Sequence, residues 1–444
     1  MNTVVVVGGG PAGMAAARAA ASAGVPVLLI DSAPKLGGQY HRQDHTPGTE
    51  AFALPDGVEY LPETVVFAVE PVPGGHRLHL RTGRADGPGR ARRRVGTAAL
   101  VLATGAHDRA LPFPGWDLPG VYTAGAAQAL AKGQRVAVGN RVVLAGTGPF
   151  LLPVAESLIG VGARVLGVLE ANDPIRGWFT HPAGLAAGYR KVPELAGYLG
   201  SLARHRVPFR PRTTVVAAHG SDRVEAVTTA RLTRDWTVVP GSERQVDVDA
   251  VCVGFGFTPR LELSVAANCA LAGGFVAVDL AQGTSVPGVF AAGELTGIGG
   301  AALAADEGEV AGLAAAEAVG ADVDVPRSAL RRVRAGRRFA SGLDSAYPVR
   351  LGWKSWLRED TLVCRCEEVG YGELCRAVEQ RDARGARSLK LVSRAGLGLC
   401  QGRVCGRNVA ELTGIPDGAA AFSRRPIAEP VRLGELANLK EDNG

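Results

Sequence analysis

Four cysteines near the C-terminal end of the chain have the spacing of a metal site. Cys364 and Cys366 are separated by one residue, Cys400 and Cys405 by four, and 33 residues lie between the two pairs. In a reducing compartment such a cluster indicates metal ligands rather than a disulfide framework. Four thiolates suit a zinc ion or an iron–sulfur cluster. The spacing leaves both open, together with unligated thiols.

The residues around these cysteines favour the iron–sulfur cluster. Gly396, Gly398, Gly402 and Gly406 flank the second pair, and glycines let backbone N–H groups turn toward cluster sulfurs. Such hydrogen bonds, together with charge and exposure, set the reduction potential of a cluster. A cluster beside a flavin would pass electrons one at a time, whereas zinc has no redox role.

A glycine loop near the N-terminus predicts a site for a nucleotide pyrophosphate. An apolar run over 3–7 is followed by this loop, by a helix expected over 14–23 and by a strand over 25–30 that ends at Asp31. This order is that of a βαβ dinucleotide-binding unit. The loop residues assigned to nucleotide binding are Gly8, Gly10, Pro11, Ala12 and Gly13.

The glycines of this loop have separate roles in the prediction. Gly8 permits the tight turn, Gly10 lets the backbone approach the pyrophosphate, and Gly13 lets the helix pack on the strand. The start of the helix offers free N–H groups and the positive end of its dipole to the phosphates. Asp31 lies 18 residues after Gly13, where a carboxylate can bond ribose hydroxyls. The alternative is a glycine-rich turn without a ligand, but both strands and the acid favour a nucleotide.

A second unit of the same kind begins near residue 141. A strand leads into Gly146 and Gly148, and a helix and a further strand follow, ending at Glu170. Glu170 favours a free ribose 2′-hydroxyl, so NAD(H) is preferred to NADP(H). Leu151 replaces the third glycine, however, and a retained fold with a blocked site is the alternative.

Two more segments belong with the first unit. An apolar run over 100–103 ends in Thr104 and Gly105, and a second run ends in Gly293 and Glu294, before a small-residue helix expected over 299–317. A carboxylate at a strand end can bond a ribityl hydroxyl, and the helix start can stabilise negative charge on a reduced flavin ring. The alternative for Glu294 is an ordinary buried strand with a charged end.

With these features the chain resembles the glutathione-reductase-like flavoproteins, an α/β class with two Rossmann-type dinucleotide-binding domains. The resemblance implies a discontinuous FAD-binding domain and, inserted within it, an NAD(H)-binding-like domain. The expected boundaries are 1–115 and 250–325 for the first domain, 116–249 for the second, 326–360 for a linker, 361–420 for a [2Fe-2S] domain and 421–444 for a C-terminal tail. Disulfide-reductase chemistry is not expected, because no cysteine precedes Cys252.

Composition excludes several classes of protein. With 21% charged and 46% hydrophobic residues the chain is not disordered, and 5% aromatic residues are few for a base-stacking nucleic-acid binder. No apolar run reaches the ~20 residues of a membrane span, and the N-terminus does not resemble a signal peptide, so a cytoplasmic location is expected. The net charge of +6 leaves open an acidic partner or an anionic membrane surface.

The order of these parts is similar to the larger (α-type) subunits of bacterial multi-subunit amine and imino-acid dehydrogenases. This family includes the larger flavin and iron–sulfur subunits of opine oxidase, of hydrogen cyanide synthase and of hydroxyproline or proline dehydrogenase. The cysteine segment resembles the bacterioferritin-associated type of ferredoxin-like [2Fe-2S] domain. The other stretches that carry the resemblance are Gly37-Gly38-Gln39, Ala103-Thr104-Gly105-Ala106, Pro112-Phe113-Pro114-Gly115-Trp116 and Ala124-Gly125-Ala126-Ala127-Gln128. Leu397 stands where the family often has Met, an exchange that conserves volume.

The resemblance also implies cofactors and partners. FAD, or ATP in some relatives, would occupy the first domain, where Gly38 and Gln39 join Asp31 and Glu294, and FMN would lie at an interface between subunits. The amine would be oxidised on a smaller FAD-containing subunit like an amino-acid oxidase, and a small ferredoxin-like subunit is a further candidate partner. Electrons would pass through FMN and the cluster to a quinone or other acceptor, which would bring the chain to the inner face of the cell membrane. No catalytic residue is assigned in this chain.

Two other functions are open at this point. In one, the chain is a self-sufficient NADH:acceptor reductase in which Gly146, Gly148 and Glu170 hold NADH. In the other, it is a non-enzymatic redox or iron sensor, which leaves two nucleotide folds unexplained. His41 and His107 follow flavin-side glycine motifs, and they either line a flavin or are hydrogen-bonded structural histidines.

Overall fold

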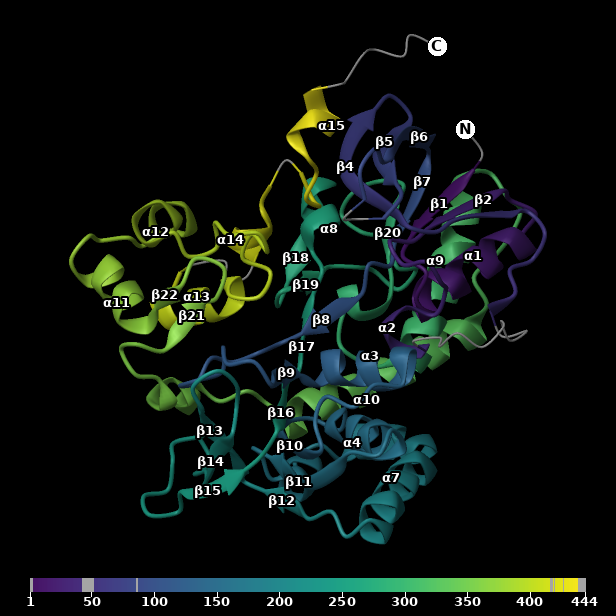
Figure 1. Ribbon diagram of the computed structural model, residues 1–444. Helices are drawn as coiled ribbons and strands as arrows, with labels where there is room; N and C mark the ends of the chain where they lie inside the picture. The colour runs from purple at the N-terminus through teal and green to yellow at the C-terminus, as the bar shows by residue number, and fades with distance from the viewer. Residues whose placement is uncertain are drawn as a thin grey trace. The chain divides into compact units, whose positions relative to one another are not determined.

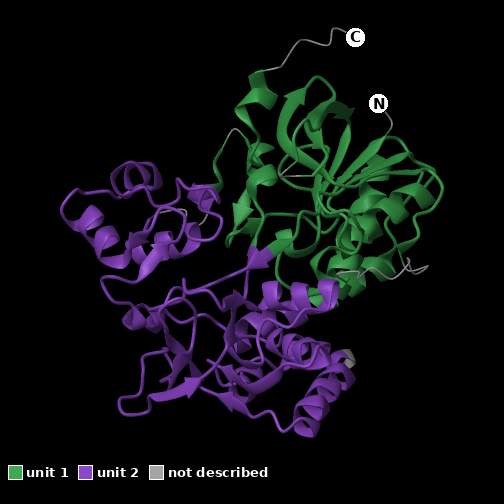
Figure 2. Ribbon diagram, in the orientation of Figure 1, with its two compact units in different colours: residues 1–106, 259–337, 423–444 green, residues 107–258, 338–422 purple. Residues whose placement is uncertain are grey.

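The computed structural model describes residues 3–41, 52–84, 87–415, 418, 420–425 and 427–437. The chain divides into two compact units (Figure 2), of which unit 1 comprises Met1–Ala106, Pro259–Arg337 and Ser423–Gly444, and unit 2 comprises His107–Thr258 and Arg338–Phe422. Each unit contains a five-stranded sheet, and the strands are labelled in Figure 1. Unit 2 therefore joins the segment expected to form the second dinucleotide domain to the segment that holds the four cysteines.

The main sheet of unit 1 is parallel and has the order β20-β7-β1-β2-β3. Its strands are β1 (Val4–Val7), β2 (Val27–Ile30), β3 (Val58–Leu61), β7 (Ala99–Leu102) and β20 (Val289–Ala291). The residues of β1, β2, β7 and β20 are all buried, as the continuous apolar runs require for strands covered on both faces. This sheet confirms the Rossmann-type fold expected for the first nucleotide unit.

Helices α1 (Pro11–Ser22) and α9 (Ala301–Ala318) pack against each other in unit 1. Their approach depends on small residues. A Cβ at Gly308 would lie 2.0 Å from the carbonyl oxygen of Ala12, and one at Gly312 would lie 2.2 Å from that of Ala16. The glycines of α9 therefore hold this helix against the start of α1, where the phosphate loop ends.

The remaining elements of unit 1 are an antiparallel sheet and short helices and strands. The sheet has the order β4-β5-β6. The elements are β4 (Thr64–Val72), β5 (Gly75–Thr82), β6 (Ala91–Thr97), α2 (Gly38–His41), α8 (Glu262–Ala266), β18 (Leu271–Ala272), β19 (Phe275–Val276), the 3-10 helix η3 (Gly293–Leu295) and α15 (Leu433–Ala437).

Helix α15 is held to the β4-β5-β6 sheet by buried arginines. Arg90 donates to both carboxylate oxygens of Glu435, at 2.8 and 2.7 Å, and Arg81 donates to the backbone carbonyl of Glu435. The hydrogen bonds from Arg90 lower the pKa of the Glu435 carboxyl to about 2. The C-terminal segment is thus attached to unit 1 by an ion pair that requires an ionised carboxylate.

We expect the attachment of α15 to weaken in acid. A carboxyl group whose folded pKa is depressed stabilises the folded form above its unfolded pKa, and that contribution is lost as the pH falls from about 4.5 toward about 2. Hydrogen–deuterium exchange over residues 432–437, corrected for the intrinsic pH dependence of exchange, should rise across this range. Glu435→Gln should exchange faster at neutral pH and lose the pH dependence. Equal pH profiles for the two proteins would contradict the expectation.

Unit 2 is built on the parallel sheet β12-β11-β10-β16-β9. Its strands are β9 (Val121–Thr123), β10 (Arg141–Thr147), β11 (Arg164–Glu170), β12 (Phe209–Pro211) and β16 (Ala250–Phe255). The other elements of this part are α3 (Ala124–Gln134), α4 (Leu151–Gly160), α5 (Pro174–Phe179), α6 (Pro182–Ala187), the 3-10 helix η2 (Tyr189–Lys191), α7 (Val192–Arg204), β13 (Thr213–His219), β14 (Ala226–Arg231) and β15 (Arg244–Asp247). A second Rossmann-type fold is therefore present, as expected.

The cysteine-containing part of unit 2 is a small helical domain. Its elements are β21 (Leu362–Cys364), β22 (Val369–Gly370), α11 (Tyr371–Glu379), α12 (Ala386–Ser393), α13 (Gly406–Thr413) and α14 (Ala420–Ser423). Its core includes Val363, Leu374, Leu389 and Val409, together with Cys364 and Cys405. Two of the four cysteines are thus part of the packing of the domain.

The segment expected as a linker over 326–360 contains regular structure. It forms the helix α10 (Arg327–Ala346) and the 3-10 helix η4 (Leu351–Trp356). Ala329, Val333 and Ala340 recur at helical spacing and are buried, so a narrow apolar stripe underlies the many arginines. On the other side Arg332 pairs with Asp306 and Glu309 of α9, at 2.7 and 2.5 Å.

Two short strands, β8 (Ala106–Asp108) and β17 (Phe257–Pro259), pair with each other. β8 follows directly on the Thr104-Gly105 turn. Within the described part of the chain, every helix is too short or too polar to cross a membrane.

Candidate functional site

The phosphate loop of unit 1 lies between β1 and α1, where it depends on glycines for close approach. Gly8 has φ +115°, and a Cβ there would lie 2.2 Å from the carbonyl oxygen of Ala103. A Cβ at Gly13 would lie 1.7 Å from the carbonyl oxygen of Gly8. Gly10, with φ −76°, has open space above it apart from Gly38. The first two glycines are needed by the fold, and Gly10 leaves room for a ligand.

Asp31 lies at the carboxyl end of β2, beside this loop. Its Oδ2 accepts a hydrogen bond from the N–H of Gly9 at 2.8 Å, and its Oδ1 accepts one from the N–H of Ala33 at 3.0 Å. Burial raises the pKa of the Asp31 carboxyl, while these N–H groups act in the opposite direction. The carboxylate is thus fixed next to the glycine loop, at the place where a ribose hydroxyl bound there would need an acceptor.

Three other predicted segments also come together at this loop. Gly38 has φ +57°, and a Cβ there would lie 2.8 Å from the Cα of Gly10, while the neighbouring Gln39 is exposed. The Thr104-Gly105 turn follows Ala103, which contacts Gly8. Gly293 has φ +79°, and a Cβ there would lie 2.9 Å from the Cβ of Ala12. The structure therefore places all twelve residues predicted for this site within one unit, around the start of α1.

Glu294 follows Gly293 in the 3-10 helix η3. Burial raises the pKa of its carboxyl to about 7, and a hydrogen bond from the N–H of Gly300 lowers it in part. Gly300 precedes the first residue of α9. Glu294 is therefore held at the start of this helix, as the sequence predicted for a group that binds a ribityl hydroxyl.

Glu307, which belongs to none of the sequence motifs, holds the backbone of this part of the site. Its Oε2 accepts hydrogen bonds from the Gly293 N–H at 2.9 Å and from the Thr296 hydroxyl at 2.8 Å. Its Oε1 pairs with Arg337 at 3.0 Å. Glu307 is buried, and the signal that could have found it is a carboxylate on the buried face of an alanine-rich helix.

In unit 2 the second glycine loop keeps its shape. Gly146 has φ +148°, and a Cβ there would lie 1.8 Å from the carbonyl oxygen of Gly254, while Gly148 has φ +110° with open space around it. Leu151, in place of the third glycine, is buried at the start of α4. The three predicted residues Gly146, Gly148 and Glu170 lie together at the ends of β10 and β11.

Glu170 is fully engaged by the protein itself. Its Oε1 accepts hydrogen bonds from the Thr147 hydroxyl at 2.7 Å and from the Asn172 N–H at 2.8 Å, and its Oε2 accepts one from the Gly148 N–H at 2.9 Å. The side chain is 1% exposed, and burial raises its pKa to about 7. No part of this carboxyl group is accessible to a ribose from outside.

The surroundings of Glu170 are closed by a segment from later in the chain. The amide of Asn172 donates to Thr147 at 2.7 Å and to the carbonyl oxygen of Pro348 at 3.0 Å, and it accepts from the indole of Trp236 at 3.2 Å. The Trp236 ring stacks on Trp356, with ring centroids 6.0 Å apart. The segment that contains Pro348 and Trp356 therefore covers the end of β11, where a second nucleotide would bind.

The four cysteines of the C-terminal motif adjoin one another. Cys405 lies near enough to Cys364 and to Cys400 to shift their pKa values, and Cys400 lies near enough to shift the pKa of Cys366. A Cβ at Gly398 would lie 2.2 Å from the Cβ of Cys366, so this glycine lets the two halves of the motif meet. Cys364 and Cys405 are buried, whereas Cys366 is exposed.

Backbone N–H groups are directed at three of these sulfurs, those of Cys364, Cys366 and Cys400. Hydrogen bonds from Cys405 lower the pKa of Cys400 to about 4 and that of Cys364 to about 6. The N–H groups of Val404 and Gly402 lower the pKa of Cys400 further, and those of Gly396 and Glu367 lower that of Cys364. The pKa of Cys405 is raised because its proton is shared with both neighbours. The pKa of Cys366 is raised as well, so the motif favours the thiolate, the form in which cysteine ligates metals, at Cys364 and Cys400.

The donor set fits a two-iron cluster. The four thiols form one continuous set, in which Cys405 adjoins both Cys364 and Cys400, and Cys400 adjoins Cys366. A [2Fe-2S] cluster takes four cysteine thiolates and receives N–H···S hydrogen bonds.

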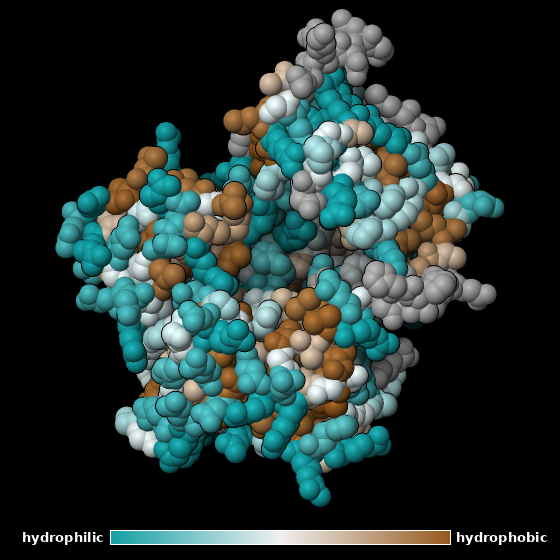
Figure 3. Space-filling view, viewed as in Figure 1, coloured by the Kyte–Doolittle hydropathy of each residue, from teal (hydrophilic) through white to brown (hydrophobic). Residues whose placement is uncertain are grey.

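The loop that carries the second pair of cysteines also exposes apolar side chains. Leu397 is 49%, Leu399 93% and Val404 44% exposed. Figure 3 shows hydrophobic residues among hydrophilic ones on the visible face of this small domain, at the left of the view. Leu399 directly precedes Cys400, so an exposed apolar side chain lies beside the second pair of cysteines.

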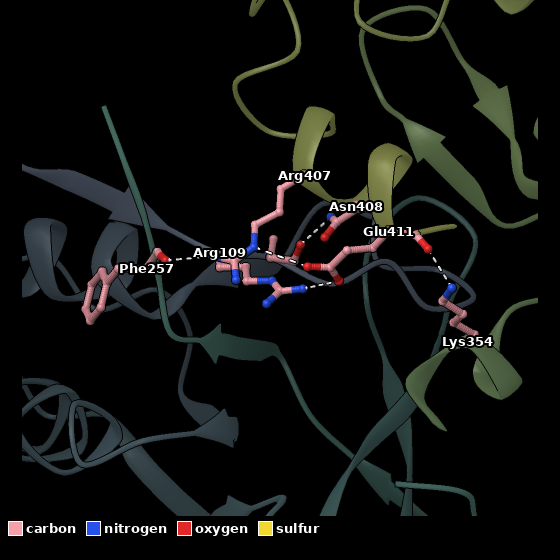
Figure 4. A network of polar contacts seen from close by, with 7 residues as sticks. Arg109, Phe257, Lys354, Arg407, Asn408 and Glu411 are labelled. Carbon is pink, nitrogen blue, oxygen red and sulfur yellow. Dashed lines mark hydrogen bonds and ion pairs between the residues drawn. The ribbon is translucent and has the colours of Figure 1, made fainter. Parts of the chain in front are cut away.

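A polar network attaches helix α13 to the rest of unit 2, as Figure 4 shows. Glu411 of α13 accepts hydrogen bonds from Arg109 at 2.5 Å and from Arg407 at 3.2 Å. Asn408 donates to the carbonyl oxygen of Ala110 at 2.6 Å, and Lys354 donates to the carbonyl oxygen of Glu411 at 2.5 Å. Arg109 is 5% exposed, and its burial lowers its pKa to about 10. The cysteine domain is thus anchored to the rest of unit 2 through charged groups that belong to none of the sequence motifs.

The two histidines considered in the sequence lie in different places. His41 ends α2 and contacts the rings of Tyr40 and Phe52 edge-on, with centroids 4.9 and 5.2 Å away. His107 lies on β8, and its Nε2 is 3.0 Å from the carbonyl oxygen of Arg403. His107 is therefore hydrogen-bonded to the loop between Cys400 and Cys405.

Comparisons with known proteins match two separate parts of this chain. Residues 2–309 match the family model described as pyridine nucleotide-disulphide oxidoreductase, and residues 362–413 match the BFD-like [2Fe-2S] binding domain. The opine oxidase A-type subunit of Agrobacterium tumefaciens (strain Ach5) is 34% identical, over 98% of this chain and 91% of that protein. The HcnB subunit of hydrogen cyanide synthase from Pseudomonas aeruginosa is 33% identical, over 98% of both.

A solved structure has the same fold over nearly the whole chain. The L-proline dehydrogenase from P. horikoshii superposes with a TM-score of 0.67 and 19% identity, over 98% of this chain and 79% of that one. Together with the family matches, this confirms two Rossmann-type folds followed by a BFD-like [2Fe-2S] domain.

Proposed function

The chain belongs to the pyridine nucleotide-disulphide oxidoreductase family, together with the A-type subunits of opine oxidase and the HcnB subunits, and from that membership we propose that it is an electron-transfer subunit. The complex would be a multi-subunit dehydrogenase that oxidises a secondary amine or imino acid of the proline, hydroxyproline, opine or glycine type. The observation that carries this proposal is the full-length similarity to named subunits of such enzymes. The amine would be bound and oxidised by a smaller FAD-containing subunit, and a small ferredoxin-like subunit would be a further partner.

The residues of the first site would hold FAD, with ATP as the alternative nucleotide. Asp31 would accept hydrogen bonds from ribose hydroxyls, the N-terminus of α1 would bind the pyrophosphate, and Glu294 would bind a ribityl hydroxyl. Cys364, Cys366, Cys400 and Cys405 would ligate the [2Fe-2S] cluster. When bound, the flavin supplies two-electron chemistry and the cluster one-electron transfer.

The state of Glu170 supports entry of electrons from a partner rather than from NADH. In an open dinucleotide site the carboxylate at the end of the second strand bonds the ribose. Here the carboxyl group is 1% exposed, against 9% for Asp31 in the first site, and Asn172 and Pro348 cover it. An NADH molecule would have to break this buried network before it could bind.

The exposed apolar residues around Cys400 support a protein partner at the cluster. Leu399 is 93% exposed, which is unusual for a leucine beside a buried site and would be relieved by a covering subunit. FMN would lie at such an interface, and a quinone acceptor would bring the complex to the inner face of the cell membrane.

An anaerobic absorbance titration with NADH tests the proposal directly. We expect the purified chain to contain flavin and iron, and we expect excess NADH to leave the flavin absorbance unchanged while dithionite reduces it. Co-expression with a small amino-acid-oxidase-like subunit should then give dye-linked activity on an amine of the proposed class.

Rapid bleaching of the flavin by NADH would contradict the proposal. The chain would then be a reductase in its own right, and Glu170→Ala should slow that bleaching. If instead every candidate partner failed to bind or to confer amine-dependent dye reduction, the subunit function itself would be wrong.

A further inference from the structure

Strand β8 and the residue after it lie against the cysteine domain. His107 and Arg109 alternate along this segment, and both contact the cysteine domain, through the Arg403 carbonyl and through Glu411. Asp108, between them, points the other way and accepts a hydrogen bond from the Gly125 N–H at 2.9 Å. The pleat of the strand therefore presents His107 to the loop between Cys400 and Cys405.

The contact made by His107 has a fixed direction. Its Nε2 lies 3.0 Å from the carbonyl oxygen of Arg403, and a carbonyl oxygen can only accept a hydrogen bond. The imidazole therefore carries a proton on Nε2 and donates it to Arg403. This assigns the tautomer from chemistry, independently of any charge on the ring.

The same peptide unit also reaches a cluster ligand. The carbonyl of Arg403 and the N–H of Val404 belong to one planar trans peptide, so they point in opposite directions. The Val404 N–H lowers the pKa of the Cys400 thiol, as a donor directed at its sulfur does. The chain of groups is thus His107 N–H to Arg403 C=O, and Val404 N–H to Cys400 sulfur. In such a chain each hydrogen bond polarises the next.

We propose that His107 is a positioning residue that sets the reduction potential of the cluster by orienting and polarising the Arg403–Val404 peptide. It acts through the peptide and does not ligate iron. The inference rests on the cluster assignment made above, but it does not depend on the identity of the partner subunit or of the amine.

The sign of the effect follows from the charge that reduction adds. A reduced cluster carries one more negative charge, and an N–H···S hydrogen bond stabilises that charge. Without His107 the Val404 N–H is less polarised and less well directed, so the reduced state is less stable. His107→Ala should therefore lower the midpoint potential.

The test is a redox titration of the full chain, with the reduced cluster monitored by electron paramagnetic resonance. In His107→Ala we expect the ratio of reduced to oxidised cluster at a fixed potential to fall about tenfold, which is about 59 mV for one electron. His107→Gln keeps a donor at a similar reach and should restore most of the potential. His219, a histidine on β13 that contacts Thr228, provides the control His219→Ala, which should leave the potential unchanged.

Several outcomes would overturn the inference. A midpoint potential in His107→Ala equal to that of the unchanged chain would do so, as would a shift of the same size in His219→Ala. If His107→Ala fails to retain iron, the inference requires that His107→Gln retain it. Loss of iron from both variants would overturn the inference, because a hydrogen-bond donor at position 107 would then not be sufficient. Hydrogen exchange of the Val404 amide, measured on the iron-free chain, should be faster in His107→Ala. That measurement tests the relay even if the chain proves to hold no cluster, which would count against the proposed function alone.

Discussion

A Cys405→Ala variant should lose its iron. It should therefore no longer pass electrons from a partner subunit to a dye. Cys405 is buried and adjoins two of the other three thiols, so its removal takes away the member of the set that lies between them. Changes to residues outside the ligand set already cost roughly 10- to 100-fold in metal affinity or activity. We expect a larger loss here, with iron content and amine-dependent dye reduction as the two measurements.

Bound flavin should be unaffected in that variant, because the first nucleotide site is built from unit 1 alone. Cys375→Ala is the matched control, since Cys375 lies on α11 in the same domain and outside the motif. It should keep iron and activity. Iron at the normal stoichiometry in Cys405→Ala would show that these four cysteines are not the ligand set, and zinc in place of iron would show that the cluster is misassigned.

Substitutions at two glycines of the phosphate loop should also have large effects. One should weaken nucleotide binding without affecting the fold, and the other should destabilise the fold. Gly10 has a φ of −76° that any residue can adopt, and a Cβ there meets only Gly38, 3.9 Å away. Gly10→Ala should therefore fold with a normal melting temperature when free of nucleotide. Its methyl group would occupy the space that the pyrophosphate needs, so FAD binding should weaken by at least about tenfold, or roughly 1.4 kcal/mol.

Gly13→Ala should behave in the opposite way. Its methyl group would lie 1.7 Å from the carbonyl oxygen of Gly8, and the overpacking of a closely packed site costs typically about 1–3 kcal/mol. The nucleotide-free variant should therefore melt at a lower temperature, as calorimetry would show. A Gly10→Ala variant that binds FAD normally would mean that the nucleotide does not lie against this loop.

The parts of the fold that the sequence predicted best are those with local signals. The glycine loops, the continuous apolar strands and the terminal acids specify βαβ units within about thirty residues. Helix α10 was not predicted, because Ala329 and Val333 form too narrow an apolar stripe among the arginines to be recognised from the sequence.

The candidate site was predictable to a similar extent. Asp31, Glu294 and the four cysteines follow from motifs, and the structure brings the members of each set together. Glu307, Arg109 and the contact of His107 depend on residues that are distant in the chain, and no local pattern reveals such pairs. The burial of Glu170 beneath Asn172 and Pro348 was not predictable for the same reason, since Pro348 lies far from Asn172 in the sequence.

Through the anchoring of α13, we expect the stability of the second dinucleotide fold to depend on the supply of iron. The helix begins directly after Cys405 and carries Glu411, the carboxylate that neutralises the buried Arg109. Ligand binding by cysteines contributes to the folding of small metal domains, and a buried cation without its partner is strongly destabilising. In iron-starved cells we therefore expect newly made chains to be degraded faster, so that the abundance of the protein follows the iron available to it.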